Sequence, residues 1–257
     1  MQTSELQAIY IMWLRQMKRF VRSRSRIIGT IVQPLFFLFI LGGGFSGATL
    51  PGMTGDYVQF IAPGIVAMAI LFSSMYTGVS VLWDKKFGFM QEILVAPVSR
   101  FSIVIGRTLG GATTAVLQGT IVLIIALLLG VPVSSTSGFI LAYIFMILIG
   151  LTSVGFGLIM ASKMEDFEGF QIIITLIIMP LFFMSSALFP IATSDKLPEI
   201  LKTISFANPL FYMIDGLRGS LTNIDYVLNP LINLVVVSVI CIIMLGVGSY
   251  LFNRTEA

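Results

Sequence analysis

The sequence contains no histidine, a single cysteine and few charged residues. Charged residues make up 11% of its 257 residues and hydrophobic residues 57%, against about 25% and about 45–50% in soluble globular domains. Cys241 has no second cysteine with which to form an intramolecular disulfide, and no companion ligand for a metal. A soluble chain this apolar would aggregate, so the composition predicts an integral membrane protein.

The charged residues are missing from long stretches of the chain. Among the stretches that contain none are those between Arg107 and Lys163, between Glu168 and Asp195, and between Asp225 and Arg254. About 20 apolar residues are needed for a helix to cross a bilayer. The sequence therefore predicts an all-α membrane protein with six transmembrane helices. Their approximate ranges are 27–45, 57–83, 108–129, 139–161, 170–189 and 229–252.

Residues 1–26 are predicted to form a cytoplasmic amphipathic helix in the membrane interface, before a transmembrane domain of residues 27–257. Apolar side chains recur at helical spacing, whereas basic side chains occupy other faces, as in helices that lie along a membrane surface. The apolar set is Leu6, Tyr10, Trp13, Met17 and Phe20, and the basic set is Arg15, Lys18, Arg19 and Arg22. The alternative is a segment whose charges only orient the chain.

Lysine and arginine are distributed unevenly between the two sides of the predicted spans. With a cytoplasmic N-terminus, only Lys196, Lys202 and Arg218 of the 15 basic residues lie outside. Positive residues concentrate on the cytoplasmic side of membrane proteins, so both termini are predicted to be cytoplasmic. Because the basic residues are distributed according to the side of the membrane, and not gathered on one face of the molecule, no nucleic-acid partner is expected.

The missing residue types also restrict how the protein obtains energy. The absence of histidine and of ionisable residues in the span centres argues against a proton- or ion-coupled carrier. No GxxxxGK[ST] string is present to hold the phosphates of ATP. The chain is therefore expected to be no enzyme, with no catalytic, metal or cofactor site, and to receive energy from another polypeptide. A passive channel remains an alternative, although pairs such as Gly106 and Gly110 are more typical of helix packing.

The loop after the second span carries the most distinctive pattern, WDKKFGFMQEILVAPVSRFSIVIGR. Phe87, Met90 and Leu94 fall on one helical stripe, and Pro97 ends the helix. This pattern predicts a short surface helix that docks in a cleft of a cytoplasmic partner. The alternative is a solvated connector.

Three strings resemble the ABC type-2 export permease family and follow its order along the chain. They are EILVAPVSR after the second span, PLFFMSSALFPI at the end of the fifth and NPLFYMIDGLRG before the last. The resemblance is closest to the branches that export drugs, polysaccharides or lipids. One departure is the pair Ser185 and Ser186, where the family commonly has serine followed by glycine.

The resemblance implies roles for residues at three places. A cytoplasmic coupling helix that enters a groove of an ATP-binding subunit would contain Glu92, Leu94, Pro97 and Arg100, with a second contact from Glu165 and Glu168. The N-terminal helix would rest beside that subunit. A short extracellular re-entrant segment would contain Asn208, Pro209, Tyr212, Asp215 and Arg218. For Asp215 and Arg218, the alternative is an ion pair that stabilises one short helix.

The resulting hypothesis is the permease subunit of an ATP-driven exporter in a prokaryotic cell membrane. It would pair with a second permease copy, as a homodimer or heterodimer, and contact membrane lipid. The ATP-binding subunits would hold ATP and Mg²⁺. Uncharged spans favour a hydrophobic, amphiphilic or lipid-linked substrate. The alternatives are an ATP-independent channel, a structural or signalling membrane protein, and an import or protein-maturation permease.

Overall fold

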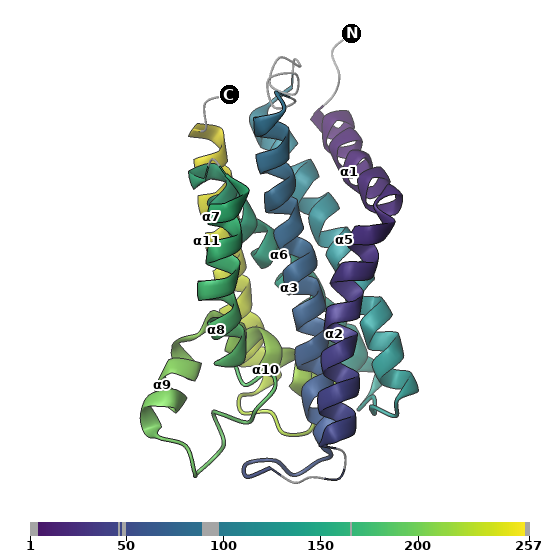
Figure 1. The fold of residues 1–257 in the computed structure, drawn as a ribbon, viewed down its shortest axis with the longest axis vertical. Coiled ribbons are helices and arrows are strands. Elements are labelled where there is room, and N and C mark those ends of the chain that lie inside the picture. The colour runs from purple at the N-terminus through teal and green to yellow at the C-terminus, as the bar shows by residue number, and fades with distance from the viewer. Residues whose placement is uncertain (1–4, 46, 48–49, 89–97, 165, 255–257) are drawn as a thin grey trace.

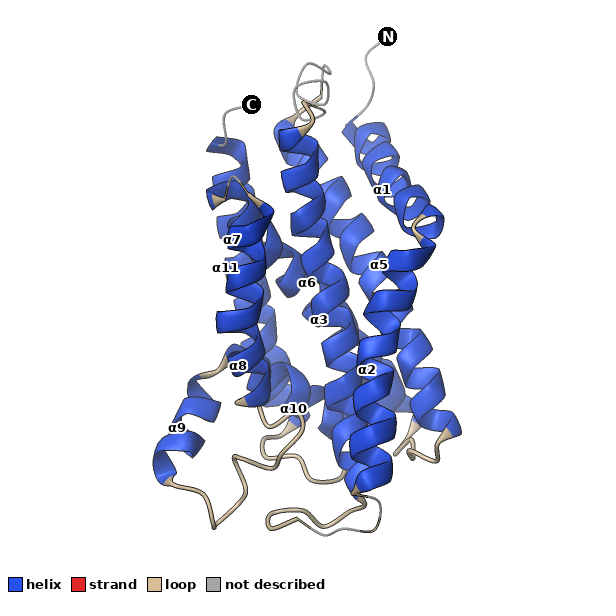
Figure 2. Cartoon of the chain, in the orientation of Figure 1, coloured by secondary structure: helices blue, strands red, loops and turns tan. Residues whose placement is uncertain are grey.

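The computed structural model describes residues 5–45, 47, 50–88, 98–164 and 166–254. Every regular element within these ranges is a helix, which confirms the all-α fold (Figures 1 and 2). Five helices are long and apolar enough to cross a membrane. They are α2 (Arg24–Gly44), α3 (Tyr57–Lys86), α5 (Arg100–Leu128), α6 (Thr136–Lys163) and α11 (Pro230–Arg254).

The segment predicted as the fifth span is shorter and less regular than the other five. It consists of α7 (Phe167–Ile173), the π-helical turn η1 (Ile174–Ile178) and α8 (Met179–Phe183). The predicted end at residue 189 is wrong. Ser186 adopts a φ of 59°, and this left-handed conformation is incompatible with continuing a right-handed helix.

Helix α3 is the most enclosed of the long helices and packs against α2, α5, α6 and α10 (Pro209–Leu221). Its backbone meets that of α6 at two glycines. A Cβ added at Gly78 would lie 2.5 Å from the carbonyl oxygen of Gly157. Small residues of this kind allow membrane helices to approach closely without a hydrophobic driving force between them.

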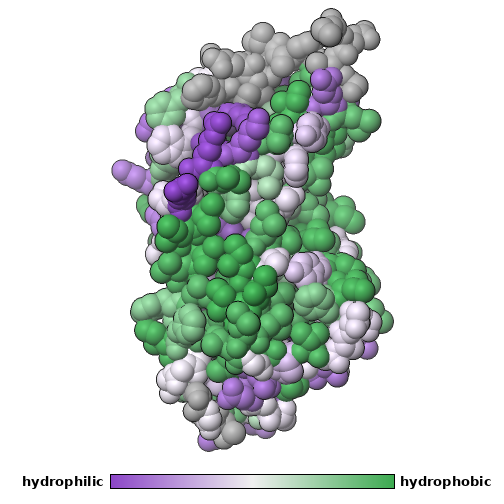
Figure 3. All heavy atoms as spheres, turned by 90° about the vertical axis from the view of Figure 1, so that its right-hand side faces the viewer, coloured by the Kyte–Doolittle hydropathy of each residue, from purple (hydrophilic) through white to green (hydrophobic). Residues whose placement is uncertain are grey.

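The two ends of the bundle carry different elements. At the upper end in Figure 1, α1 (Glu5–Arg22) lies near the end of α3 and the start of α5. At the opposite end, α9 (Glu199–Ala207) and α10 lie beside the loops. On the face shown in Figure 3, a broad apolar band separates hydrophilic residues above from hydrophilic residues below. This band has the character of a lipid-facing surface.

Two boundaries at the upper end differ from the predicted spans. Helix α3 continues to Lys86, and α5 begins at Arg100 rather than near residue 108. Asp84 and Arg107, which the sequence places outside the spans, therefore lie within helices. Both are buried, with exposed fractions of 3% and 0%.

Candidate functional site

Helix α1 packs lengthwise on α5 through two glycines. A Cβ added at Gly106 would lie 2.6 Å from Cβ of Met12, and one at Gly110 would lie 2.7 Å from Cβ of Gln16. The packing role predicted for this glycine pair is confirmed. Trp13 adds a polar contact, because its indole Nε1 donates to Oγ1 of Thr113 at 3.2 Å.

The face of α1 that packs on the bundle shares only Phe20 with the predicted apolar stripe, although Trp13 of that stripe also contacts α5. Ala8, Met12, Gln16 and Phe20 are buried, at steps of four residues. Leu6 and Tyr10 are 78% and 57% exposed. The helix thus has two apolar faces. Packing selects the face that fits against the two glycines of α5 and leaves the other face outward.

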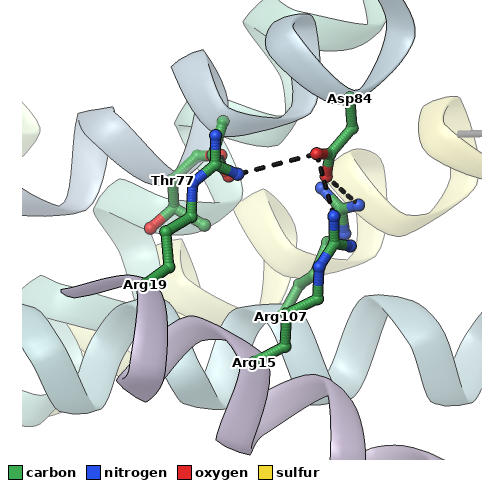
Figure 4. A network of polar contacts seen from close by, with 6 residues as sticks. Arg15, Arg19, Thr77, Asp84 and Arg107 are labelled. Carbon is green, nitrogen blue, oxygen red and sulfur yellow. Dashed lines mark hydrogen bonds and ion pairs between the residues drawn. The ribbon is translucent and has the colours of Figure 1, made fainter. Parts of the chain in front are cut away.

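The carboxylate of Asp84 on α3 forms ion pairs with three arginines, as Figure 4 shows. Its Oδ2 atom lies 2.5 Å from Nη2 of Arg107 on α5. Its Oδ1 atom lies 3.1 Å from Nη2 of Arg15 and 3.6 Å from Nη1 of Arg19, both on α1. We call these four residues the Asp84 cluster. One carboxylate thereby joins α1, α3 and α5.

The members of the Asp84 cluster differ in their exposure to solvent. The side chain of Arg107 is fully buried, whereas those of Arg15 and Arg19 are 38% and 37% exposed. A buried ion that loses its partner is strongly destabilising, whereas exposed pairs contribute little. The pair of Asp84 with Arg107 is therefore the structural centre, and the two arginines of α1 attach to it from the surface.

Lys18 and Arg22, the other predicted basic residues of α1, are exposed and line a cavity beside the Asp84 cluster. Sequence reasoning did not select Asp84. The available signal was a single acid directly after a long apolar run and before two lysines.

The predicted coupling segment is described only in part. Glu92, Leu94, Pro97 and Glu165 lie outside the described residues. Arg100 is exposed in the first turn of α5 and Glu168 is exposed on α7.

Glu5 of α1 contacts the same end of α5. The N-cap of α5 is Ser99, whose Oγ accepts from the Ser102 backbone N–H at 3.1 Å. The Ser99 hydroxyl also donates to Oε2 of Glu5 at 2.8 Å. The first turn of α1 is thus tied to the N-cap of α5, next to the predicted coupling residue Arg100.

The predicted outer residues lie together at the opposite end of the bundle. Asn208 is the N-cap of α10, and its Oδ1 accepts from the Leu210 backbone N–H at 3.0 Å. Pro209 occupies the first helical position, where a missing N–H costs nothing. The Tyr212 hydroxyl donates to the Phe206 carbonyl at 2.8 Å, which joins α10 to α9.

Asp215 and Arg218 are buried, and each has its own partners. Asp215 accepts from the Val227 and Leu228 backbone N–H groups at 2.8 and 2.9 Å. Its Oδ2 also accepts from Nδ2 of Asn233 at 2.8 Å.

Arg218 donates to three carbonyl oxygens, those of Phe60 at 3.1 Å, Ser186 at 2.8 Å and Ala187 at 3.5 Å. Its guanidinium carbon lies 3.9 Å from the centre of the Phe60 ring. The alternative of a simple ion pair with Asp215 along α10 is therefore wrong. The two residues anchor α10 to separate parts of the fold.

The sequence is similar to known proteins over most of its length. The family model described as ABC-2 type transporter matches residues 7–222. The chain is 28% identical over 218 residues to the ycf38 protein of Cyanophora paradoxa, covering 83% of this chain and 73% of that protein. It is 27% identical over 238 residues to the inner membrane transport permease YadH of Escherichia coli K12, covering 92% and 90%. It is also 27% identical over 224 residues to nodulation protein J of Rhizobium leguminosarum bv. viciae, covering 85% and 82%.

Proposed function

Because the chain belongs to the ABC-2 type transporter family, we propose that it is the permease subunit of an ATP-driven exporter. Relatives named as transport permeases support a membrane transport protein rather than an enzyme. Export would require a second permease copy and ATP-binding subunits that hold ATP and Mg²⁺. The name of YadH supports placement in the cytoplasmic membrane.

The Asp84 cluster is the observation that carries this proposal. Helix α3 ends at Lys86 and α5 begins at Arg100, so these helices flank the proposed coupling segment with Glu92, Leu94 and Pro97. The cluster fixes both helices to each other and to α1. A displacement of the coupling segment by an ATP-binding subunit would therefore move three helices as one unit.

An uncharged cavity of about 200 Å³ supports the proposed kind of substrate. It lies between α2, α3 and the segment from α7 to α8, and no charged residue is among the described residues that line it. Its polar groups come from Gln33, Tyr76, Gln171 and Thr175. Such a lining suits a hydrophobic or amphiphilic molecule, and the cavity would form part of the export path.

The coupling proposal is tested by charge reversal in the proposed coupling segment. Glu92→Lys should weaken co-purification with the ATP-binding subunit and reduce ATP-dependent export. Glu199→Lys, the same change on exposed α9 at the other end of the bundle, is the matched control. If Glu92→Lys leaves both subunit binding and export unchanged, the coupling role is wrong. Transport that proceeds without any ATP-binding subunit would instead identify a channel.

The substrate proposal has a separate test. The permease and its ATP-binding subunit are reconstituted together in vesicles, and movement of a fluorescent amphiphile is compared with that of small hydrophilic ions. ATP-dependent movement of the amphiphile is expected. Movement of the ions alone would refute the proposed substrate class.

A further inference from the structure

A cavity of about 1030 Å³ lies between α1, the start of α2 and the end of α3. Its lining combines basic, apolar and hydroxyl side chains. The basic residues are Arg15, Lys18, Arg19, Arg22 and Arg24. The only acid among the described residues that line it is Asp84. The cavity is therefore strongly positive.

Three of the basic residues are available to a ligand. Within the described ranges, Lys18, Arg22 and Arg24 are exposed and have no acidic partner. Arg15 and Arg19 contact Asp84, whose charge is also shared with Arg107. A single carboxylate thus neutralises only part of the positive charge.

The N-terminus of α2 adds to the positive potential. Its N-cap, Ser23, makes no capping hydrogen bond through its side chain, and the first turn contains Arg24 and no acidic residue in the described structure. Free backbone N–H groups and the helix dipole make such an end favourable for an anion. Ser23 and Ser25, which also line the cavity, supply hydroxyl donors.

The other side of the cavity is apolar. Ile11, Leu14, Trp83 and Phe87 line it, and the rings of Trp83 and Phe87 stack with centroids 5.0 Å apart. A second cavity of about 380 Å³ shares Arg19, Ser23, Ser25 and Trp83 with the first and extends along α3 past Ser80 and Val79 to Tyr76. Its apolar lining comes from Trp83 and Val79, with Tyr76 at its far end. A ligand that fills both would have an anionic head and an apolar tail.

We propose that this basic cavity binds the phosphate headgroup of an anionic membrane phospholipid, with an acyl chain following α3 toward Tyr76. The position of the basic cavity near the ends of the membrane helices supports a lipid headgroup over a free anion as its ligand. On the face shown in Figure 3, hydrophilic residues border the apolar band directly, as a headgroup region borders the hydrocarbon of a bilayer. Anionic lipids attract basic segments beside membrane helices.

Bound lipid would act on the Asp84 cluster. Arg15 and Arg19 face both the cavity and Asp84, so a phosphate would compete with Asp84 for them. Lipid occupancy would thereby adjust how firmly α1 is attached to α3. This inference goes beyond export, because it concerns a resident lipid rather than the cargo.

The test measures lipid binding to the full chain purified in detergent. Native mass spectrometry gives apparent affinities for phosphatidylglycerol and for zwitterionic phosphatidylcholine. The wild type should prefer phosphatidylglycerol at least tenfold. Each basic residue near an anionic headgroup contributes about fivefold in affinity, so the combined Lys18→Gln, Arg22→Gln and Arg24→Gln variant should bind about a hundredfold more weakly.

Matched variants keep the result interpretable. Lys163→Gln removes an exposed charge from α6, whose end meets Lys85 of α3, outside the cavity, and should leave binding unchanged. The single Arg24→Gln variant should lose about fivefold in affinity for phosphatidylglycerol. It replaces the combined variant in the test if the combined variant does not fold.

Three outcomes would overturn the proposal: equal affinity of the wild type for both lipids, an unchanged preference in the variants, or full displacement of phosphatidylglycerol by millimolar inorganic phosphate. The assay needs neither an ATP-binding subunit nor transport. Its failure is therefore distinguishable from failure of the proposed export function.

Discussion

Asp84 and Arg107 form an ion pair between α3 and α5, with side chains 4% and 0% exposed. The two residues stand near the ends of helices that are consecutive in the described chain and enclose the 89–97 segment between them. The pair therefore joins the last turn of α3 to the early turns of α5. Arg15 connects the same point to α1.

Removing the charge of Asp84 should destabilise the protein more than removing the pair. Asp84→Asn leaves the Arg107 guanidinium buried without its counter-ion, and breaking a buried pair in this way costs about 3–5 kcal/mol. Thermal unfolding in detergent should show a large drop in the midpoint. The double variant Asp84→Asn with Arg107→Met should recover part of it, since apolar replacements of buried pairs are tolerated. If the double variant loses as much stability as Asp84→Asn and Arg107→Met lose separately when added together, the two residues are not coupled.

Glycine at 106 should be required for α1 to dock on α5. In Gly106→Ala, the new Cβ would lie 2.7 Å from the Ile9 carbonyl oxygen, which belongs to the backbone of α1. Overpacking of this kind costs about 1–3 kcal/mol, so hydrogen exchange of the α1 amides should accelerate. Gly29→Ala in α2 is the control, because nothing lies within 4 Å of its added Cβ. Equal exchange in both variants would contradict close packing at Gly106.

The sequence predicted the features that depend on local composition. Apolar runs identified the long helices because a helix in lipid needs a continuous apolar surface. The pair Gly106 and Gly110 was recognisable because small residues four apart share one helix face. Helix ends were predicted less well, as the early start of α5 at Arg100 shows.

The Asp84 cluster was not predicted, for a physical reason. In the sequence, Lys and Arg near the spans indicate which side of the membrane a loop lies on. Arg15 and Arg107 therefore count as basic residues of the cytoplasmic side, and nothing in the sequence pairs them with an acid. Their joint approach to Asp84 depends on how α1 and α5 pack, and that packing is set by Gly106 and Gly110 across 90 or more residues of chain. Amphipathicity alone also failed to select the packed face of α1, because the helix has two apolar faces.

Ser186 should be replaceable by glycine with little loss, but not by alanine. Its φ of 59° costs a non-glycine residue roughly 1–2 kcal/mol, while its Oγ accepts from the Ala192 N–H at 3.1 Å, a bond worth about 1 kcal/mol. In Ser186→Gly the two effects offset each other. Ser186→Ala keeps the strain and loses the bond, so its unfolding midpoint should be lower. A midpoint for alanine equal to or above that for glycine would show that the backbone strain is absent.

The contact of Glu5 with the start of α5 should depend on pH. Hydrogen bonds from the side chains of Ser102 and Ser99 lower the pKa of Glu5 below its ordinary value of 4.5. Because the pKa is lowered in the folded protein, the contact is fully present above 4.5 and is lost as the pH falls through the lowered value. At neutral pH, Glu5→Gln should therefore increase hydrogen exchange in the first turn of α1.

The same comparison in acid completes this test. After correction for intrinsic exchange rates, wild type and Glu5→Gln should converge as the pH falls below the pKa of Glu5, since both then carry a neutral side chain. Glu168→Gln, on exposed α7, should leave exchange in α1 unchanged at every pH. A difference between wild type and Glu5→Gln that persists in acid would mean that the charge of Glu5 does not hold α1 against α5.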